Sequence, residues 1–348
     1  MSSSTSILIA TRGSALALAQ ANMVLAQCRA AFPKLAFELK IIKTTGDKLQ
    51  TASMAQEGKS LPKGLFTKEL EVALLKHRAD VAVHSLKDLP TDLPAGLKLG
   101  AVGKRADVRD VLIYRDAAWL QKAEADTHSA DWSPGQSRRR GFAPKLQMED
   151  LPPGAVVATS STRRRAQLLA HNPGINAPDI RGNVVTRMQK LAERPELDAT
   201  LLALAGLTRL NFQVTAEGKL QGDAVPDGLL ATILEPEEML PCVGQGAVGI
   251  EVREHDERIA AICERLNHYN TSQCVTAERA FLSAMGGGCQ SPVAAYAEVV
   301  GDKLRMRALS FAAGPLRSAE ATRPLKEATE LGQQLAAELK QERASIVG

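Results

Sequence analysis

The alternation of short apolar runs with helical patterns in the first hundred residues is the feature that most restricts the fold. Apolar runs at 7–10, 37–42 and 81–83 predict strands, and helical spacing at 15–31 and 66–77 predicts the helices between them. This order is typical of βαβ units, in which a largely parallel sheet carries helices on both faces. We therefore expect an α/β domain at the start of the chain.

The same alternation returns in the second half of the chain. Apolar residues at 155–158 and 199–204 predict strands, and residues 163–171 and 183–193 have the pattern of helices. These segments predict a second doubly wound domain.

The last eighty residues predict a small third α/β module. Two alternating segments, 293–299 and 303–308, flank Gly301 and Asp302, which is a hairpin signal, and residues 324–340 have a helical pattern.

Composition argues against several classes of protein. The 348 residues are 45% hydrophobic and 24% charged, as in a globular chain of two or three domains. A net charge of only +4 and 3% aromatic residues argue against nucleic-acid binding. No apolar stretch reaches the roughly 18 residues of a membrane span. Five cysteines without a Cys-x-x-Cys pair argue against a disulfide framework or a metal site, and fit a cytoplasmic protein.

The segment 117–148 breaks the α/β pattern. It is rich in Ala, Asp, Ser, Pro and Gly and contains the basic run 138–140. We expect a flexible insertion that contributes no core, with the basic run as solvated surface.

Cys289 follows three glycines, Gly286 to Gly288, and Gln290, Ser291 and Pro292 come directly after it. Free cysteines are often small buried hydrophobic residues. Glycines, however, permit positive φ and close approach of a bulky group, so this loop is expected to present the thiol to a ligand.

The segment 244–249, Gly-Gln-Gly-Ala-Val-Gly, matches the letters of the dinucleotide-binding fingerprint. That fingerprint requires a strand before it and a helix after it. A proline-containing loop precedes this segment and a β-like pattern follows it, so we interpret it as a flexible connection between domains.

The segment 84–90, His-Ser-Leu-Lys-Asp-Leu-Pro, follows the strand expected at 81–83. Open α/β sheets bind ligands at the carboxyl ends of their strands, so Lys87 and Asp88 are candidate site residues. A surface ion pair between them is the simpler alternative. A Ser–His hydrolase is disfavoured because the chain has no Gly-x-Ser-x-Gly elbow before a helix.

Arginines gather just after apolar runs, at expected strand ends and helix N-termini. Guanidinium groups at such places favour bound anions, which predicts a small polycarboxylate or phosphate ligand. Cations in the first turn of a helix oppose its dipole, so two of these arginines are expected to serve binding and not stability. The six are Arg12, Arg163, Arg164, Arg181, Arg187 and Arg209.

Taken in order along the chain, these motifs resemble the porphobilinogen deaminase family, also called hydroxymethylbilane synthase. The resemblance covers about residues 1–115 and 150–300, and its motifs are specific only in combination. They lie at 10–14 (ATRGS), 84–90 (HSLKDLP), 181–184 (RGNV), 243–247 (VGQGA) and 287–290 (GGCQ).

The resemblance implies three domains, the first two like periplasmic anion-binding proteins with the active site in the cleft between them. It places domain 1 at 1–103 and 247–265, domain 2 at 108–240, and a C-terminal domain at 268–348. It implies a monomer.

The resemblance also implies a dipyrromethane cofactor in thioether linkage to Cys289. Four porphobilinogen molecules are joined head to tail on this primer with loss of ammonia, and a linear tetrapyrrole is released. Asp88 is the implied catalytic carboxylate. The implied contacts to cofactor carboxylates are Lys87, Ser14, Arg163, Arg164, Thr159, Ser160 and Ser161, and those to substrate are Arg12, Arg181, Arg187, Arg209 and Lys63.

The chain departs from the family pattern at several positions. Leu61 and Pro62 replace a glycine pair before Lys63, Asn211 replaces a glycine, and Arg165 extends an expected pair of arginines. Two rival functions remain open: an anion-binding module without catalysis, and a thiol hydrolase with His255 or His268 as the base.

Overall fold

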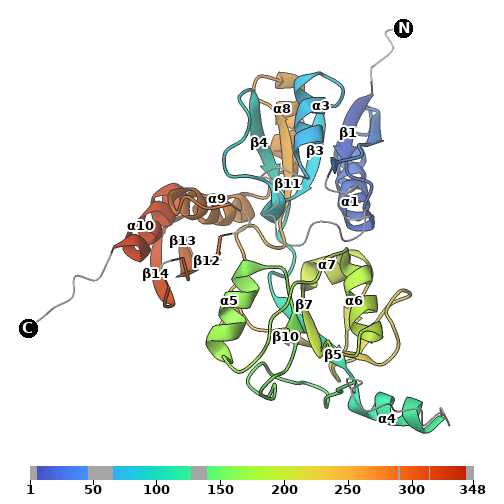
Figure 1. Cartoon of the computed structure of the whole chain (residues 1–348). Helices are drawn as coiled ribbons and strands as arrows, with labels where there is room; N and C mark the ends of the chain where they lie inside the picture. The colour runs from blue at the N-terminus through green and yellow to red at the C-terminus, as the bar shows by residue number, and fades with distance from the viewer. Residues whose placement is uncertain (1–5, 46–65, 127–138, 289–290, 313, 342–348) are drawn as a thin grey trace, which may run out of the picture. The chain divides into compact units, whose positions relative to one another are not determined.

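The computed structural model describes residues 6–45, 66–126, 139–288, 291–312 and 314–341 (Figure 1). Two predicted site residues, Cys289 and Lys63, lie outside these ranges. The chain forms two compact units, the first made of Met1–Ala106 with Pro241–Gly348 and the second of Asp107–Leu240.

The first unit contains a five-stranded sheet in the order β2-β1-β3-β11-β4. Strands β1, β2 and β3 run parallel, and β11 runs antiparallel to β3 and β4 on either side. The chain thus returns from the second unit to complete this sheet. The strands are β1 (Ile7–Thr11), β2 (Phe37–Ile41), β3 (Val81–Ser85), β4 (Leu97–Val102) and β11 (Val248–Arg253).

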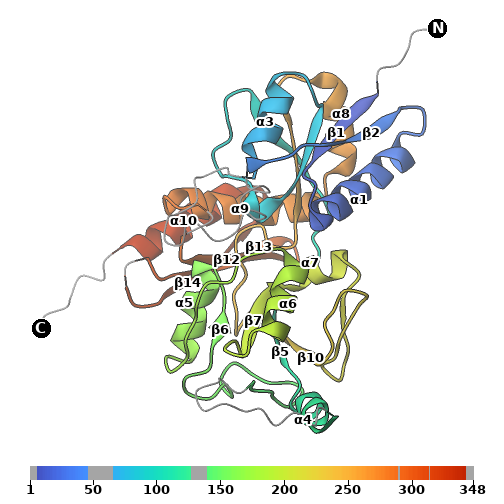
Figure 2. The ribbon, with the colours of Figure 1, turned by 45° about the vertical axis from the view of Figure 1, so that its right-hand side comes forward.

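Helices cover both faces of this sheet. On one face, α1 (Ala15–Ala31) and α8 (Glu257–Leu266) pack on a core that includes Val81 and Val83. On the other, α3 (Lys68–Leu75) packs on Ala82. Successive strand residues point to opposite faces, which explains this division. Figure 2 shows α1 beside β1 and β2.

The C-terminal module is also part of the first unit. Its antiparallel sheet has the order β12-β13-β14, and α9 and α10 share its core. A Cβ built on Gly332 of α10 would lie 2.1 Å from the carbonyl oxygen of Ala277 on α9, so only glycine permits this close helix packing. The elements are α9 (Tyr269–Ala284), β12 (Val293–Val300), β13 (Lys303–Ser310), β14 (Arg317–Pro324), the 3₁₀ turn η2 (Leu325–Glu327) and α10 (Ala328–Lys340).

A buried carboxylate joins this module to the first sheet. Glu278 on α9 is fully buried and accepts hydrogen bonds from Arg105 Nη1 at 2.6 Å and Nη2 at 3.0 Å. It also accepts from the backbone N–H of Gly244 at 2.8 Å and of Ala297 at 2.9 Å. The predicted separation of 268–348 as its own domain stays a prediction.

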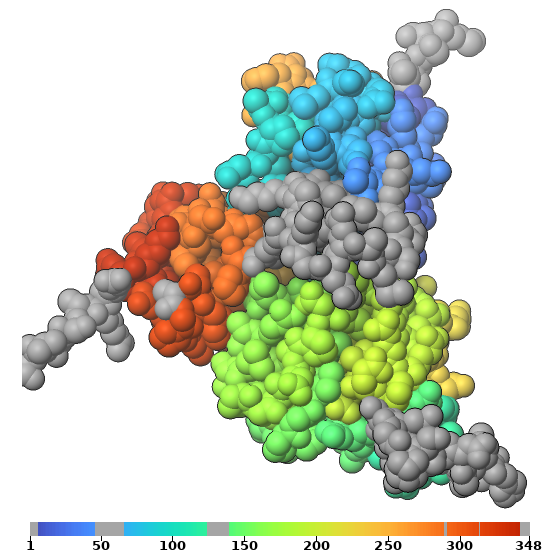
Figure 3. All heavy atoms as spheres, viewed as in Figure 1, coloured from blue at the N-terminus to red at the C-terminus, as the bar shows by residue number. Residues whose placement is uncertain are grey.

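The second unit is built on a four-stranded sheet in the order β10-β5-β7-β6, in which β6 and β7 form a parallel pair and β5 runs antiparallel to β7 and β10. Core residues fill both faces of the sheet, and Figure 3 shows the unit, in green to yellow, as one body. The elements are β5 (Asp110–Arg115), α4 (Ala117–Asp126), β6 (Val157–Ala158), α5 (Thr162–His171), α6 (Val184–Glu193), β7 (Ala199–Ala203), α7 (Leu204–Arg209), the small pair β8 (Gln213–Val214) and β9 (Leu220–Gln221), and β10 (Leu229–Leu234).

The predicted fold class, two doubly wound α/β domains plus a small C-terminal α/β module, is confirmed. The expectation of a largely parallel first sheet is confirmed, because β1, β2, β3 and β4 run in one direction and β11 runs against them. In the second sheet β5 is the reversed strand, and β6, β7 and β10 run in one direction. Strand β14 was not predicted; it ends at Pro324, the first residue of the segment expected to be helical, and α10 begins at Ala328. The rejection of 244–249 as a dinucleotide-binding fingerprint is confirmed, since the segment leads into strand β11 and not into a helix. Its interpretation as a flexible connection between domains is wrong, because the segment is buried within the first unit. No helix among the described residues is long and apolar enough to cross a membrane.

The expectation that segment 117–148 contributes no core is also wrong. Helix α4 occupies its start, and Leu146 and Met148 at its end are 8% and 2% exposed within the core of the second unit. Phe142 packs against the same core and pairs with Asp116.

We therefore expect only the polar stretch 127–138 to be replaceable. A short Gly/Ser linker in its place should leave turnover within about twofold and the melting temperature unchanged. A linker replacing 121–146 should lower the stability by at least about 2 kcal/mol, because it removes the buried side chain of Leu146. Thermal unfolding and steady-state turnover of the two variants check this. A tenfold loss of turnover in the shorter replacement would place 127–138 in the site.

Candidate functional site

In the first unit, the predicted site residues follow two neighbouring strands. Arg12 and Ser14 come after β1, and Lys87 and Asp88 form part of the 3₁₀ turn η1 (Leu86–Asp88) that follows β3. Strands β1 and β3 are parallel and adjacent, so their carboxyl ends lie at one edge of the sheet. This is the edge where open α/β sheets bind ligands.

The turn after β1 is fixed by hydroxyl groups. Ser14 is the N-cap of α1, and its Oγ accepts a hydrogen bond from the N–H of Ala17 at 3.3 Å. Thr11 is fully buried and donates from Oγ1 to the Ala17 carbonyl at 3.2 Å. Because the cap uses only an acceptor position of Ser14, its O–H can still donate to a ligand. The Arg12 guanidinium lies 4.2 Å from the centroid of the Phe66 ring.

The turn that carries Asp88 is held from several sides. Leu86 N–H donates to the carbonyl of Ala247, just before β11, at 3.0 Å. Gln20 on α1 donates from Nε2 to Ser85 Oγ at 2.9 Å. Arg279 on α9 donates from Nη2 to the carbonyl of Pro90 at 2.6 Å. The sequence interpretation missed Gln20 and Arg279, because nothing in their local spacing shows that they reach this turn.

Lys87 and Asp88 are both half-buried. Within the described ranges, the Asp88 carboxylate has no hydrogen-bond or ion-pair partner. It is thus a partly desolvated charge, held on a fixed turn, that remains available to a cationic or N–H-bearing group.

In the second unit, the loop 159–161 joins β6 to α5. Ser161 is the N-cap of α5 and accepts from the N–H of Arg164 at 3.3 Å, and Thr159 Oγ1 accepts from the N–H of Ser161 at 3.2 Å. Ser160 Oγ donates to the carbonyl of Ile180 at 2.8 Å and accepts from its N–H at 3.0 Å. Ser160 therefore ties this loop to the one before Arg181, and its hydroxyl proton is already used.

Three further predicted arginines lie in this unit. Arg181 is exposed, and Arg187 on α6 is half-buried with its Nε donating to the carbonyl of Gly182 at 2.9 Å. Burial lowers the pKa of Arg209 at the end of α7. Asn211 follows at φ +61°, a left-handed conformation that explains why glycine is usual in the family here.

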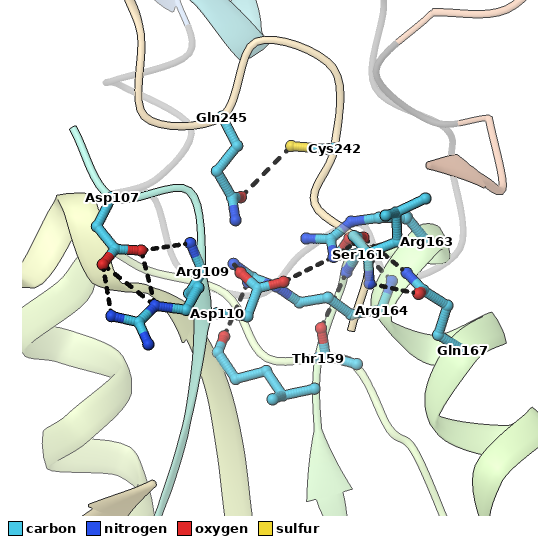
Figure 4. A network of polar contacts seen from close by, with 12 residues as sticks. Asp107, Arg109, Asp110, Thr159, Ser161, Arg163, Arg164, Gln167, Cys242 and Gln245 are labelled. Carbon is cyan, nitrogen blue, oxygen red and sulfur yellow. Dashed lines mark hydrogen bonds and ion pairs between the residues drawn. The ribbon is translucent and has the colours of Figure 1, made fainter. Parts of the chain in front are cut away.

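Arg163 and Arg164 converge on a carboxylate that the sequence interpretation did not single out (Figure 4). Asp110, at the start of β5, is fully buried. Its Oδ2 lies 2.6 Å from Arg163 Nη1 and its Oδ1 lies 2.7 Å from Arg164 Nη2. Arg163 also donates to the Leu240 carbonyl at 2.9 Å, and Arg164 to the Leu201 carbonyl at 2.8 Å.

These contacts correct one expectation. Burial alone would raise the pKa of Asp110, but the Arg163 and Arg164 guanidinium groups outweigh it and hold the pKa well below its usual range. The two arginines are therefore the counter-ions of a buried carboxylate, and the expectation that they serve binding alone is wrong. Their predicted contact with a ligand stays a prediction.

Replacing Asp110 by asparagine is expected to lower the free energy of unfolding by about 3–5 kcal/mol at pH 7, because two buried guanidinium groups lose their counter-ion. The folded-state pKa lies below the unfolded value of about 3.9, so this contribution is present above about pH 4 and is lost as the pH falls. The difference in melting temperature between wild type and variant should shrink below pH 4.

Asp107→Asn is the control for that variant. Its carboxylate is 36% exposed and pairs with Arg109, and such pairs contribute only about 0–1 kcal/mol. Equal losses in the two variants would contradict the role assigned to Asp110.

The second unit also fits a ligand with several carboxylates. Arg164 Nε is buried and has no hydrogen-bond partner among the described residues, so a guanidinium donor remains after Asp110 is bound. The N-terminus of α5 begins at the same place and favours a negative charge. The donor set suits the acetate and propionate groups of a dipyrromethane.

Fold and site together define an α/β protein with basic side chains after several strands and a half-buried carboxylate at the end of one of them. Two family models match the chain: the dipyromethane cofactor binding domain of porphobilinogen deaminase over residues 7–261 and its C-terminal domain over residues 272–341. A porphobilinogen deaminase from Paracoccus denitrificans is 40% identical over 338 residues, which cover 96% of this chain and 93% of that relative. The chain belongs to the porphobilinogen deaminase family, whose members are transferases with a dipyrromethane cofactor.

The solved structures that match this chain are less similar to it in sequence. An OxyR mutant from Corynebacterium glutamicum is 14% identical with a TM-score of 0.38, and the match covers 76% of this chain and 64% of that one. A periplasmic VFT2 domain of BvgS from Bordetella pertussis is 13% identical with a TM-score of 0.34, over 74% of this chain and 86% of that one.

Proposed function

We propose that this chain joins four porphobilinogen molecules head to tail into the linear tetrapyrrole hydroxymethylbilane, with loss of one ammonia at each addition. The observation that carries the proposal is the half-buried Asp88 carboxylate, without a protein partner among the described residues, on a turn fixed at the ligand-binding edge of the first sheet.

Asp88 is proposed to be the catalytic residue. Its carboxylate stabilises positive charge on pyrrole nitrogens during ammonia loss and carbon–carbon bond formation, and it accepts and returns a proton there. A fixed charge in a partly desolvated place is effective because it needs no reorganisation as the substrate charge develops.

The arginines and their neighbours are proposed to bind carboxylates. Arg12, Arg181, Arg187, Arg209 and Lys63 hold the acetate and propionate groups of substrate. Lys87, Ser14, Thr159, Ser160, Ser161, Arg163 and Arg164 hold those of the dipyrromethane cofactor, whose attachment residue is Cys289. When bound, the cofactor supplies the terminal pyrrole carbon to which the first substrate is joined.

The test is turnover of porphobilinogen by the purified chain, followed by ammonia release and mass spectrometry of the products. We expect one ammonia per porphobilinogen consumed and a linear tetrapyrrole product. Binding of porphobilinogen without ammonia release would favour the rival function, an anion-binding module. A Cys289 that carries no pyrrole adduct, together with loss of activity on treatment with a thiol-directed inhibitor, would favour the thiol hydrolase.

We also propose that the chain acts as a cytoplasmic monomer, without nucleic acid or membrane partners. Its low net charge and scarcity of aromatic residues support the absence of nucleic-acid partners, and cysteines without a Cys-x-x-Cys pair support a cytoplasmic location. Light scattering of the active protein checks the oligomeric state.

A further inference from the structure

Three ionisable side chains are buried on the α3 face of the first sheet. Glu251 on β11 is 0% exposed, His84 on β3 is 5% exposed and Glu71 on α3 is 8% exposed. His84 shares its face of β3 with Ala82, which packs on α3, because side chains alternate along a strand. Figure 1 shows α3, β3 and β11 together in this part of the unit.

His84 and Glu251 form a hydrogen-bonded pair. Nε2 of His84 lies 2.9 Å from Oε2 of Glu251, and the side chains are 3% and 0% exposed. Nε2 is the donor, because a carboxylate only accepts. The other oxygen, Glu251 Oε1, is buried without a hydrogen-bond partner among the described residues. Removal of His84 would thus leave this carboxylate with neither of its oxygens paired.

Glu71 does not compete for His84 as a second carboxylate. Burial raises the pKa of Glu71, and the nearby Glu251 carboxylate raises it further. Glu71 also has no hydrogen bond or ion pair with His84 among the described residues, so Glu251 is the carboxylate that His84 contacts.

A buried ionic or polar pair is a poor source of stability, because removing the groups from water costs about as much as their attraction returns. The position of the His84–Glu251 pair in the fold is more informative than its contribution to stability. His84 stands four residues before Asp88, and its strand partner in β11 is Gly249. The carbonyl of Ala247, two residues before Gly249, accepts the hydrogen bond from Leu86 that holds the Asp88 turn. The His84–Glu251 hydrogen bond therefore links β3 to β11 close to the backbone hydrogen bond from Leu86 to Ala247 that holds the Asp88 turn.

We infer that His84 and Glu251 are positioning residues for Asp88: their hydrogen bond sets the end of β3, and with it the turn that carries the catalytic carboxylate. The inference rests on the proposed function, since it needs Asp88 to act in the reaction. The arginines proposed to bind substrate come from segments other than β3 and β11, so loss of the His84–Glu251 hydrogen bond should leave them in place. We therefore expect kcat to fall and KM to stay nearly unchanged.

The experiment compares four variants of the cofactor-loaded protein in steady-state and single-turnover assays. His84→Met and Glu251→Gln are expected to lower kcat at least about tenfold with KM within about twofold. His84→Gln keeps a donor near the Nε2 position and should recover most of kcat. Asp80→Asn is the matched control, because Asp80 pairs with Arg253 of the same strand β11 at 3.0 Å and lies away from the turn. It should lose thermal stability and keep kcat.

Equal kcat in wild type, His84→Met and Glu251→Gln, with only a lower melting temperature as in Asp80→Asn, would make the pair structural and overturn the inference. If His84→Met does not fold, Glu251→Gln and its comparison with His84→Gln decide. Glu71→Gln should keep kcat, because Glu71 has no hydrogen bond to His84 among the described residues; a loss equal to that of Glu251→Gln would contradict the assignment of the pair to His84 and Glu251. Full activity of Asp88→Asn would instead overturn the proposed role of Asp88 itself.

Discussion

Replacing Cys289 by serine is expected to yield protein with little or no covalently bound pyrrole and less than about 1% of wild-type turnover. A thiolate is a much better nucleophile than a serine hydroxyl towards the cationic intermediate formed when porphobilinogen loses ammonia. The thioether that results withstands the repeated proton transfers beside it. Without the primer, the chain lacks the group on which the condensation starts.

The other cysteines are poor alternatives for attachment. Burial raises the pKa of Cys28 and Cys263 to about 11 and that of Cys274 to about 12, so each has almost no thiolate near neutral pH. Cys242 is half-buried and lies 3.4 Å from Gln245 Oε1, to which its thiol can donate (Figure 4). Cys242 is less buried than these three cysteines, so Cys242→Ser is the control for Cys289→Ser.

Intact-protein mass and peptide mapping decide between these cysteines. Wild type and Cys242→Ser should both carry an increment of two pyrrole units on the peptide that contains Cys289, and Cys289→Ser should carry none. A pyrrole adduct on another cysteine, or full turnover by Cys289→Ser, would end the assignment. Cys289→Ser is also expected to melt at a lower temperature than wild type, because the cofactor carboxylates no longer offset the positive charge of the clustered arginines.

Local features of the fold were readable from the sequence because short-range interactions determine them. The limits of α1, 15–31, were predicted to the residue, since Ser14 caps one end and the apolar pattern stops at the other. Helix α5, expected at 163–171, begins at Thr162, because Ser161 caps it there. The turn at Gly301 has φ +64°, as a hairpin glycine requires.

Partners far apart in the sequence could not be predicted in this way. Asp110 meets Arg163 across 53 positions, and Arg105 meets Glu278 across 173. Neither acid stands in a pattern that identifies its partner, because the pairing depends on how strands and helices are brought together. This explains why Arg163 and Arg164 were interpreted as binding residues alone. Asp88 was easier to find, since it directly follows a strand at the edge where ligands bind.

Replacing Asp88 by asparagine is expected to lower the rate of the chemical step by at least about a hundredfold, on the scale of other preorganised charge stabilisers. Asparagine keeps the size of the side chain and removes the negative charge. It also cannot accept and return a proton as a carboxylate does. The melting temperature should change little, since the Asp88 carboxylate is half-buried and has no hydrogen-bond or ion-pair partner among the described residues.

Single-turnover measurements separate this chemical role from binding. Asp88→Asn that is loaded with cofactor should bind porphobilinogen with an affinity close to that of wild type, because the carboxylates of substrate are proposed to be held by arginines. Asp88→Glu keeps the charge but moves it by one methylene group, and it should keep a small part of the activity.

Asp92→Asn, on the exposed stretch after the same turn, tests whether any acid nearby matters and should be fully active. Equal single-turnover rates for Asp88→Asn and wild type would remove Asp88 from the mechanism. A hundredfold loss with unchanged affinity would place the missing stabilisation, about 2.7 kcal/mol, in the transition state and not in the bound substrate.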